Sequence, residues 1–98
     1  MAKGYWMTTY REILDADKLA AYAALAATAV QANGGRFLVR GGRMQPKEAA
    51  VAERTVLVEF DSYEQALATY EELPAYQEAL KALEGGVVRD LRIVEGID

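Results

Sequence analysis

Gly34-Gly35-Arg36-Phe37-Leu38-Val39-Arg40-Gly41-Gly42 is the stretch of this sequence that decides the fold. A glycine pair stands at each end, and glycine tolerates positive φ angles, so the pairs mark where one element stops and another starts. Between the pairs, Arg36, Leu38 and Arg40 alternate with Phe37 and Val39. The alternation predicts a short strand with one apolar face and one face that carries two cations.

The segments on either side of this strand contain the other predicted elements. An alanine-rich run with helical spacing of its apolar residues precedes the first glycine pair. The aromatic segment 3–10 has bulky side chains on both faces, which predicts an inner strand. In chain order, the sequence predicts strands at 3–10, 36–40, 54–60 and 89–95, with helices at about 17–31, from 62 onward and at 74–84.

Polar residues and a proline set the expected helix ends. Asp15 or Asp17 can cap the first helix, because a carboxylate at that position accepts a backbone N–H bond. Ser62 followed by Gln65 has the pattern of a capping box, in which each side chain bonds the other's backbone N–H. Pro74 lacks an N–H and clashes with a preceding turn, so we expect a separate helix to begin there.

The order strand, helix, strand, strand, helix, strand predicts an α+β, ferredoxin-like fold. Right-handed crossovers then place the helices on one face of a four-stranded antiparallel sheet, in a single domain over residues 1–98. The other face has no covering element in this chain, although it carries apolar side chains. Because an apolar face of that size is unfavourable in water, we expect a homodimer that packs sheet on sheet.

The hydrophobic pattern also predicts which side chains of the two middle strands share a face. Phe37 and Val39 are expected under the helices with the apolar set Val56, Val58 and Phe60. The open face then combines Arg36, Leu38 and Arg40 with Thr55, Leu57 and Glu59. A dimer that closes over this face would enclose a partly polar cavity.

Composition excludes several classes of function. The 98 residues have a formal net charge of −4 and a pI of about 4.8, which argues against nucleic acid as a partner. The sequence has no cysteine and no histidine, so it lacks the usual metal ligands, a thiolate nucleophile and a histidine base. We therefore expect no metal and no cofactor, and a reducing cytoplasm fits the lack of cysteine. No apolar segment approaches the roughly 20 residues that a membrane helix needs, so we expect no membrane segment.

Several motifs together resemble the domain-of-unknown-function 1330 family. They are Lys3-Gly4-Tyr5-Trp6, the glycine-flanked arginine strand 34–42, Glu53-Arg54, Glu59-Phe60, Pro74-x-Tyr76-Gln77 and Val94-Glu95-Gly96. The family is similar to the dimeric α/β-barrel superfamily, which implies ferredoxin-like protomers joined as a dimer. That superfamily includes cofactor-free monooxygenases, muconolactone isomerases, haem enzymes and proteins with no known activity. Leu83 and Glu84 stand near where the family usually has an arginine.

Five residues are candidates for a ligand site: Arg36, Arg40, Glu59, Trp6 and Tyr10. The arginines suit a carboxylate or enolate oxygen, and Glu59 could act as a base or orient a substrate. The same charges could equally form structural ion pairs at a dimer interface. Trp6 could wall a pocket and Tyr10 could donate to a carbonyl, although aromatic residues at this spacing also build cores. The sequence identifies no catalytic residue.

Two hypotheses of function follow. The first is a small-molecule-binding dimeric barrel for a small organic or acidic ligand, acting as a cofactor-independent enzyme of the monooxygenase or isomerase type on an enolisable or aromatic substrate. The second is a non-catalytic stress or interaction module with the same fold. A pocket of a few hundred Å³ that holds Arg40 and Glu59 together would favour the first.

Overall fold

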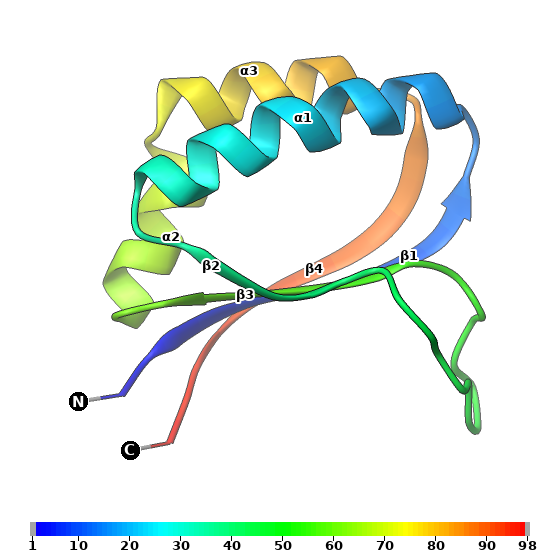
Figure 1. Ribbon diagram of the computed structural model, residues 1–98, viewed down its shortest axis with the longest axis horizontal. Coiled ribbons are helices and arrows are strands. Elements are labelled where there is room, and N and C mark those ends of the chain that lie inside the picture. The colour runs from blue at the N-terminus through cyan, green and yellow to red at the C-terminus, as the bar shows by residue number, and fades with distance from the viewer. Residues whose placement is uncertain (1, 98) are drawn as a thin grey trace.

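The computed structural model describes residues 2–97 and confirms the predicted order of elements (Figure 1). The predicted domain, residues 1–98, extends one residue beyond this range at each end. The elements are β1 (Gly4–Ile13), α1 (Ala16–Ala32), β2 (Arg36–Arg40), β3 (Thr55–Phe60), α2 (Tyr63–Glu71), α3 (Pro74–Leu83) and β4 (Val87–Glu95). The strands form one antiparallel sheet in the order β2-β3-β1-β4, which is the ferredoxin-like arrangement.

The helices and the sheet form two layers. Helices α1 and α3 lie side by side over one face of the sheet, and α2 leads into α3 near the end where the termini lie (Figure 1). The loop between β2 and β3 projects to the side away from the helices. No helix within residues 2–97 is long and apolar enough to cross a membrane. One face of the sheet is thus covered by this chain and the other is open.

Side-chain caps fix the helix starts mostly as predicted. Asp15, rather than Asp17, caps α1 by accepting hydrogen bonds from the backbone N–H groups of Asp17 and Lys18. Ser62 caps α2, accepting from the N–H of Gln65 at 3.0 Å. The reciprocal half of the capping box is absent because the Gln65 amide donates to the carbonyl of Asn33 instead, which ties the start of α2 to the end of α1.

The core between the layers is aromatic. Phe60 and Tyr76 are completely buried, and Trp6 is 2% exposed with its ring 5.1 Å from that of Phe60. The indole Nε1 of Trp6 donates to the carbonyl of Ala66 at 2.8 Å, so the polar atom of a buried tryptophan is satisfied within the fold. Trp6 therefore faces the helices, a point that its sequence left open.

The register of β2 differs from the prediction after Phe37. Arg36 pairs with Glu59 and Phe37 with Val58, which puts both β2 residues on the faces expected for them, but a β-bulge at Leu38 then shifts the strand by one residue. A bulge reverses the faces of the residues that follow it. Val39 pairs with Leu57 on the open face, where it is 39% exposed, and Arg40 turns to the helix side. The predictions that Val39 lies under the helices and that Arg40 shares the open face with Glu59 are therefore wrong.

The open face remains apolar despite this change. Met7, Val39 and Val94 are large hydrophobic side chains exposed on it, and Leu57 is half-buried between them in the sheet. The open face therefore presents apolar side chains on all four strands, beside charged residues such as Arg92. Such a face is unusual on a small protein that stays monomeric.

Candidate functional site

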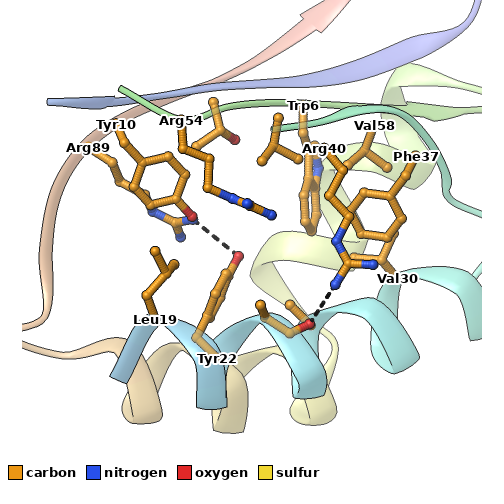
Figure 2. A pocket seen from close by; sticks show the side chains of 14 residues that line it. Trp6, Tyr10, Leu19, Tyr22, Val30, Phe37, Arg40, Arg54, Val58 and Arg89 are labelled. Atoms are coloured by element: carbon orange, nitrogen blue, oxygen red, sulfur yellow. Dashed lines mark hydrogen bonds between the residues drawn. The ribbon is translucent and has the colours of Figure 1, made fainter. Parts of the chain in front are cut away.

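A pocket opens between α1 and the sheet (Figure 2). Its walls are largely apolar and come from the aromatic core and the inner side of α1: Trp6, Leu19, Ala23, Ala26, Val30, Phe37, Val56 and Val58. The polar side chains in the lining are Thr8, Tyr10, Tyr22, Arg40, Arg54 and Arg89. Apolar walls with a few convergent polar groups are typical of small-molecule sites.

The three arginines approach the pocket from different elements. Arg40 ends β2, Arg54 stands just before β3, and Arg89 lies near the start of β4. Arg40 is held at the rim, where its Nη2 donates to the carbonyl of Ala23 at 3.3 Å and its guanidinium lies 4.9 Å from the centre of the Phe37 ring. The side chain of Arg54 extends into the space between the other two arginines (Figure 2). Three cations therefore line the same pocket.

Arg89 is fixed by a cluster of phenol groups. Its Nη1 donates to the hydroxyl oxygens of Tyr10 at 3.3 Å and Tyr22 at 3.1 Å, and its Nη2 donates to that of Tyr76 at 3.2 Å. The hydroxyls of Tyr22 and Tyr76 are also bonded to each other at 2.7 Å. The guanidinium lies 4.9 Å from the centre of the Tyr22 ring, within cation–π range. These contacts leave Arg89 little freedom to move.

No carboxylate among residues 2–97 forms an ion pair with the arginines of this pocket. The lining that the same residues form contains no carboxylate either. Burial raises the pKa values of Tyr10 and Tyr76 above the ordinary value, so these phenols stay neutral. Burial opposes the charge of Arg89, but the surrounding hydroxyls of Tyr22 and Tyr76 outweigh it and its pKa stays above the ordinary arginine value. The pocket is therefore cationic at any physiological pH.

The pocket itself is small. Its volume is about 30 Å³, which suffices for roughly two water molecules or one compact polar group. The Thr8 side chain lines this space and is 3% exposed. The same residues contain no cluster of acidic side chains suited to a metal ion. The pocket can take the head group of a ligand, with the rest of the ligand in the mouth.

A second polar cluster lies on the open face of the sheet. Arg36 Nε contacts Glu59 Oε1 at 3.1 Å, Arg36 Nη2 contacts Asp61 at 3.1 Å, and the Tyr5 hydroxyl donates to Glu59 Oε2 at 3.0 Å. Burial opposes ionisation of Glu59, but the bonds from Tyr5 and Arg36 outweigh it and lower the carboxyl pKa. Every charge in this cluster has a partner, as in a structural ion-pair network.

The five residues predicted from sequence thus fall into two groups. Arg40, Trp6 and Tyr10 line the pocket, whereas Arg36 and Glu59 pair with each other on the opposite face. A single cavity that contains Arg40 and Glu59 does not form within one protomer, because the sheet separates them.

Sequence reasoning missed Arg54, Arg89, Tyr22 and Tyr76 as a set. A signal for both arginines was available in the strand alternation. Arg54 alternates with Val56 and Val58 along one strand, so it is expected on the same sheet face as these valines. Arg89 stands in the same relation to Leu91 and Ile93. An arginine on the core-facing side of a strand must find an internal polar partner or a ligand.

Family comparison agrees with the fold. The profile of the family described as Domain of unknown function (DUF1330) matches residues 3–97. The chain belongs to the DUF1330 family. No curated protein matches this chain.

Solved structures of other proteins share the fold of this DUF1330 protein. A protein of unknown function from Rhodopseudomonas palustris is 15% identical with a TM-score of 0.75, covering 99% of this chain and 84% of its own. A Nitrosomonas europaea protein, named as a candidate antibiotic biosynthesis monooxygenase, is 17% identical with a TM-score of 0.60, covering 98% and 90%. A NIPSNAP-family protein of unknown function from Agrobacterium tumefaciens is 16% identical with a TM-score of 0.51, covering 95% and 86%. At these identities the likeness shows the fold alone, the ferredoxin-like arrangement of helices on a four-stranded antiparallel sheet.

Proposed function

We propose that this DUF1330 protein binds a small organic anion, a carboxylate or an enolate with an apolar body, in the pocket between α1 and the sheet. The observation that supports this is the set of three arginines lining an apolar pocket without a carboxylate partner among residues 2–97. Guanidinium groups bind carboxylate and enolate oxygens through paired N–H donors, and the bond is stronger where water is excluded.

The arrangement supports binding with little reorganisation. Arg89 is held by three phenol oxygens and Arg40 by a backbone carbonyl, so their geometry is set before the ligand arrives. The apolar body of the ligand would lie against the exposed side of Phe37 and Val56 at the mouth. A bound anion would offset the repulsion among the three cations and so stabilise the folded protein.

The lining also limits the chemistry that the pocket can support. It has no carboxylate and no histidine, and its buried phenols are neutral donors, so no lining residue is a strong base. The pocket suits a substrate whose enol is acidic enough to ionise in water. Its enolate could then react in the cofactor-independent manner of a monooxygenase or isomerase, because the arginines would stabilise the negative charge. The same lack of a base favours a non-catalytic binding module as the alternative.

The proposal includes a homodimer formed through the open face of the sheet in a cytoplasmic protein. Met7, Leu57, Val39 and Val94 supply apolar side chains there, and a second copy placed by a two-fold axis presents the same residues. The pocket opens on the other side of the sheet, so ligand binding and dimerisation use separate surfaces.

A thermal-melting screen tests the binding proposal with matched acids and amides, such as hexanoate against hexanamide and benzoate against benzamide. A ligand that binds only the folded state stabilises it by about 2.7 kcal/mol at one hundred times its Kd, so binding acids raise the melting temperature. We expect acids to stabilise and their neutral amides to have no effect. Equal shifts from both members of each pair would refute an anion site.

The variant Arg54→Met locates the site, because Arg54 enters the pocket and takes part in no ion pair among residues 2–97. It should stay folded and lose most of the response to acids. Arg43→Met is the matched control, since it removes one positive charge from the same connection outside the pocket lining. Oxygen uptake and solvent proton exchange, measured with each enolisable acid that binds, separate an enzyme from a binding module.

A further inference from the structure

The three pocket arginines differ in depth and position. Arg40 is exposed at the rim, whereas Arg54 and Arg89 are half-buried. In the view of Figure 2, Arg89 and Arg40 stand at opposite ends of the pocket with Arg54 between them. The cations are therefore spread along the pocket and do not converge on one point.

The rim arginine is held in place even though it is exposed. The bulge at Leu38 turns Arg40 away from the open face, and the bond to the Ala23 carbonyl together with the Phe37 ring keeps it at the mouth. An exposed arginine loses side-chain entropy when it is fixed in this way. A cation fixed at the mouth, at a distance from the inner pair, is suited to a second anionic group.

The charges of the three arginines also favour a ligand with two anionic groups. A ligand with one negative charge leaves the three guanidinium groups with two uncompensated charges, whereas a dianion leaves one. The pocket volume of about 30 Å³ leaves too little room for two carboxylates side by side, so a second anionic group would lie at the rim, where Arg40 is exposed.

We infer that the ligand is a dianion, such as a dicarboxylate or a carboxylate that also bears an enolate, with one group at Arg54 and Arg89 and the other at Arg40. This inference rests on the proposed function, because it assigns the charge and length of the anion that the pocket binds. Arg40 is a specificity-determining residue in this arrangement, because it gives the pocket a higher affinity for dianions than for monoanions.

Isothermal titration calorimetry on the intact protein tests the inference with acids of equal chain length, butyrate against succinate and hexanoate against adipate. We expect at least one dicarboxylate to bind about tenfold more tightly than its monocarboxylate, the gain of one charge-assisted contact of about 1.4 kcal/mol. Arg40→Met should remove this preference, so that a dicarboxylate and the monocarboxylate of equal chain length bind the variant with similar affinity. Arg43→Met, with the same loss of net charge, should keep the preference.

The outcomes distinguish this inference from the proposed function. If monocarboxylates and dicarboxylates bind the wild type equally, the dianion inference fails while the anion site stands. If no acid binds, both fail. A preference that survives in Arg40→Met, or is lost equally in Arg43→Met, would show that Arg40 does not hold the second group. Arg40→Gln repeats the test with a polar side chain if the methionine variant aggregates.

Discussion

Replacing Tyr76 with phenylalanine should destabilise the protein far more than the loss of one oxygen atom suggests. Tyr76 is completely buried, and its hydroxyl bonds the Tyr22 hydroxyl at 2.7 Å and accepts from Arg89 Nη2 at 3.2 Å. A neutral hydrogen bond contributes about 1 kcal/mol, and one to a charged donor about 1.5–3 kcal/mol. Removing the buried hydroxyl also relieves a desolvation cost of at least about 1 kcal/mol.

The expected result for Tyr76→Phe is therefore a loss of about 2 kcal/mol in the free energy of unfolding. For a domain of this size, that corresponds to a fall of roughly 10 °C in melting temperature. Urea denaturation measures this loss. Wild type and variant are compared at the same protein concentration, because the measured stability of a dimer depends on concentration.

Tyr70→Phe is the matched control for this measurement. Tyr70 belongs to the same aromatic group, with its ring 5.2 Å from that of Tyr76, but its hydroxyl bonds no other residue of the described range 2–97. Its loss should change stability by no more than about 0.5 kcal/mol. Equal effects of the two substitutions would refute the view that the phenol cluster holds Arg89 in the core.

Three further predictions concern the helix cap, the open-face cluster and the dimer. Ser62→Ala should cost about 1 kcal/mol in chemical denaturation and leave the mass in light scattering unchanged, and an unaltered midpoint would mean that Ser62 does not cap α2. Because the pKa of Glu59 is lowered in the fold, its ionisation stabilises the protein above the unfolded-state value of about 4.3, and this contribution is lost as pH falls through the folded value. Glu59→Gln should therefore lower the urea midpoint near pH 7 but match the wild type near pH 3, and a gap that is constant with pH would contradict this. Leu57→Lys should convert a dimer into a folded monomer, whereas a wild-type mass of one protomer at micromolar concentration would exclude the dimer itself.

Much of the fold could be predicted because local patterns and packing agree. The β-branched run at β3, the cap at Ser62 and the proline at the start of α3 each determine an element without help from distant residues. The apolar alternation likewise placed Phe37 and Val58 correctly on one face of the sheet. These features depend on near neighbours, which a single sequence displays.

The bulge at Leu38 could not be predicted in this way. Strict alternation from Arg36 to Arg40 is compatible with a regular strand, and the irregular register is stabilised by contacts with Ala23 on α1, which lies far away in the sequence. One inserted residue then moved Arg40 to the opposite face. Strand alternation does place Arg54 and Arg89 on the core-facing side of the sheet. Their meeting with Tyr22 and Tyr76 depends on how separate elements pack, which a single sequence does not display.

The connection between β2 and β3 offers a permissive place for engineering. Its base is closed by the bond from the Gly41 N–H to the Thr55 carbonyl at 2.9 Å, so Arg40 and Arg54 are anchored independently of the residues between them. Lengthening a closed loop adds little conformational cost, and the loop projects away from the helices. A peptide tag or a fluorescent reporter inserted near Pro46 should leave the pocket intact. In a chain without cysteine, one cysteine placed there would also give a unique point for chemical labelling.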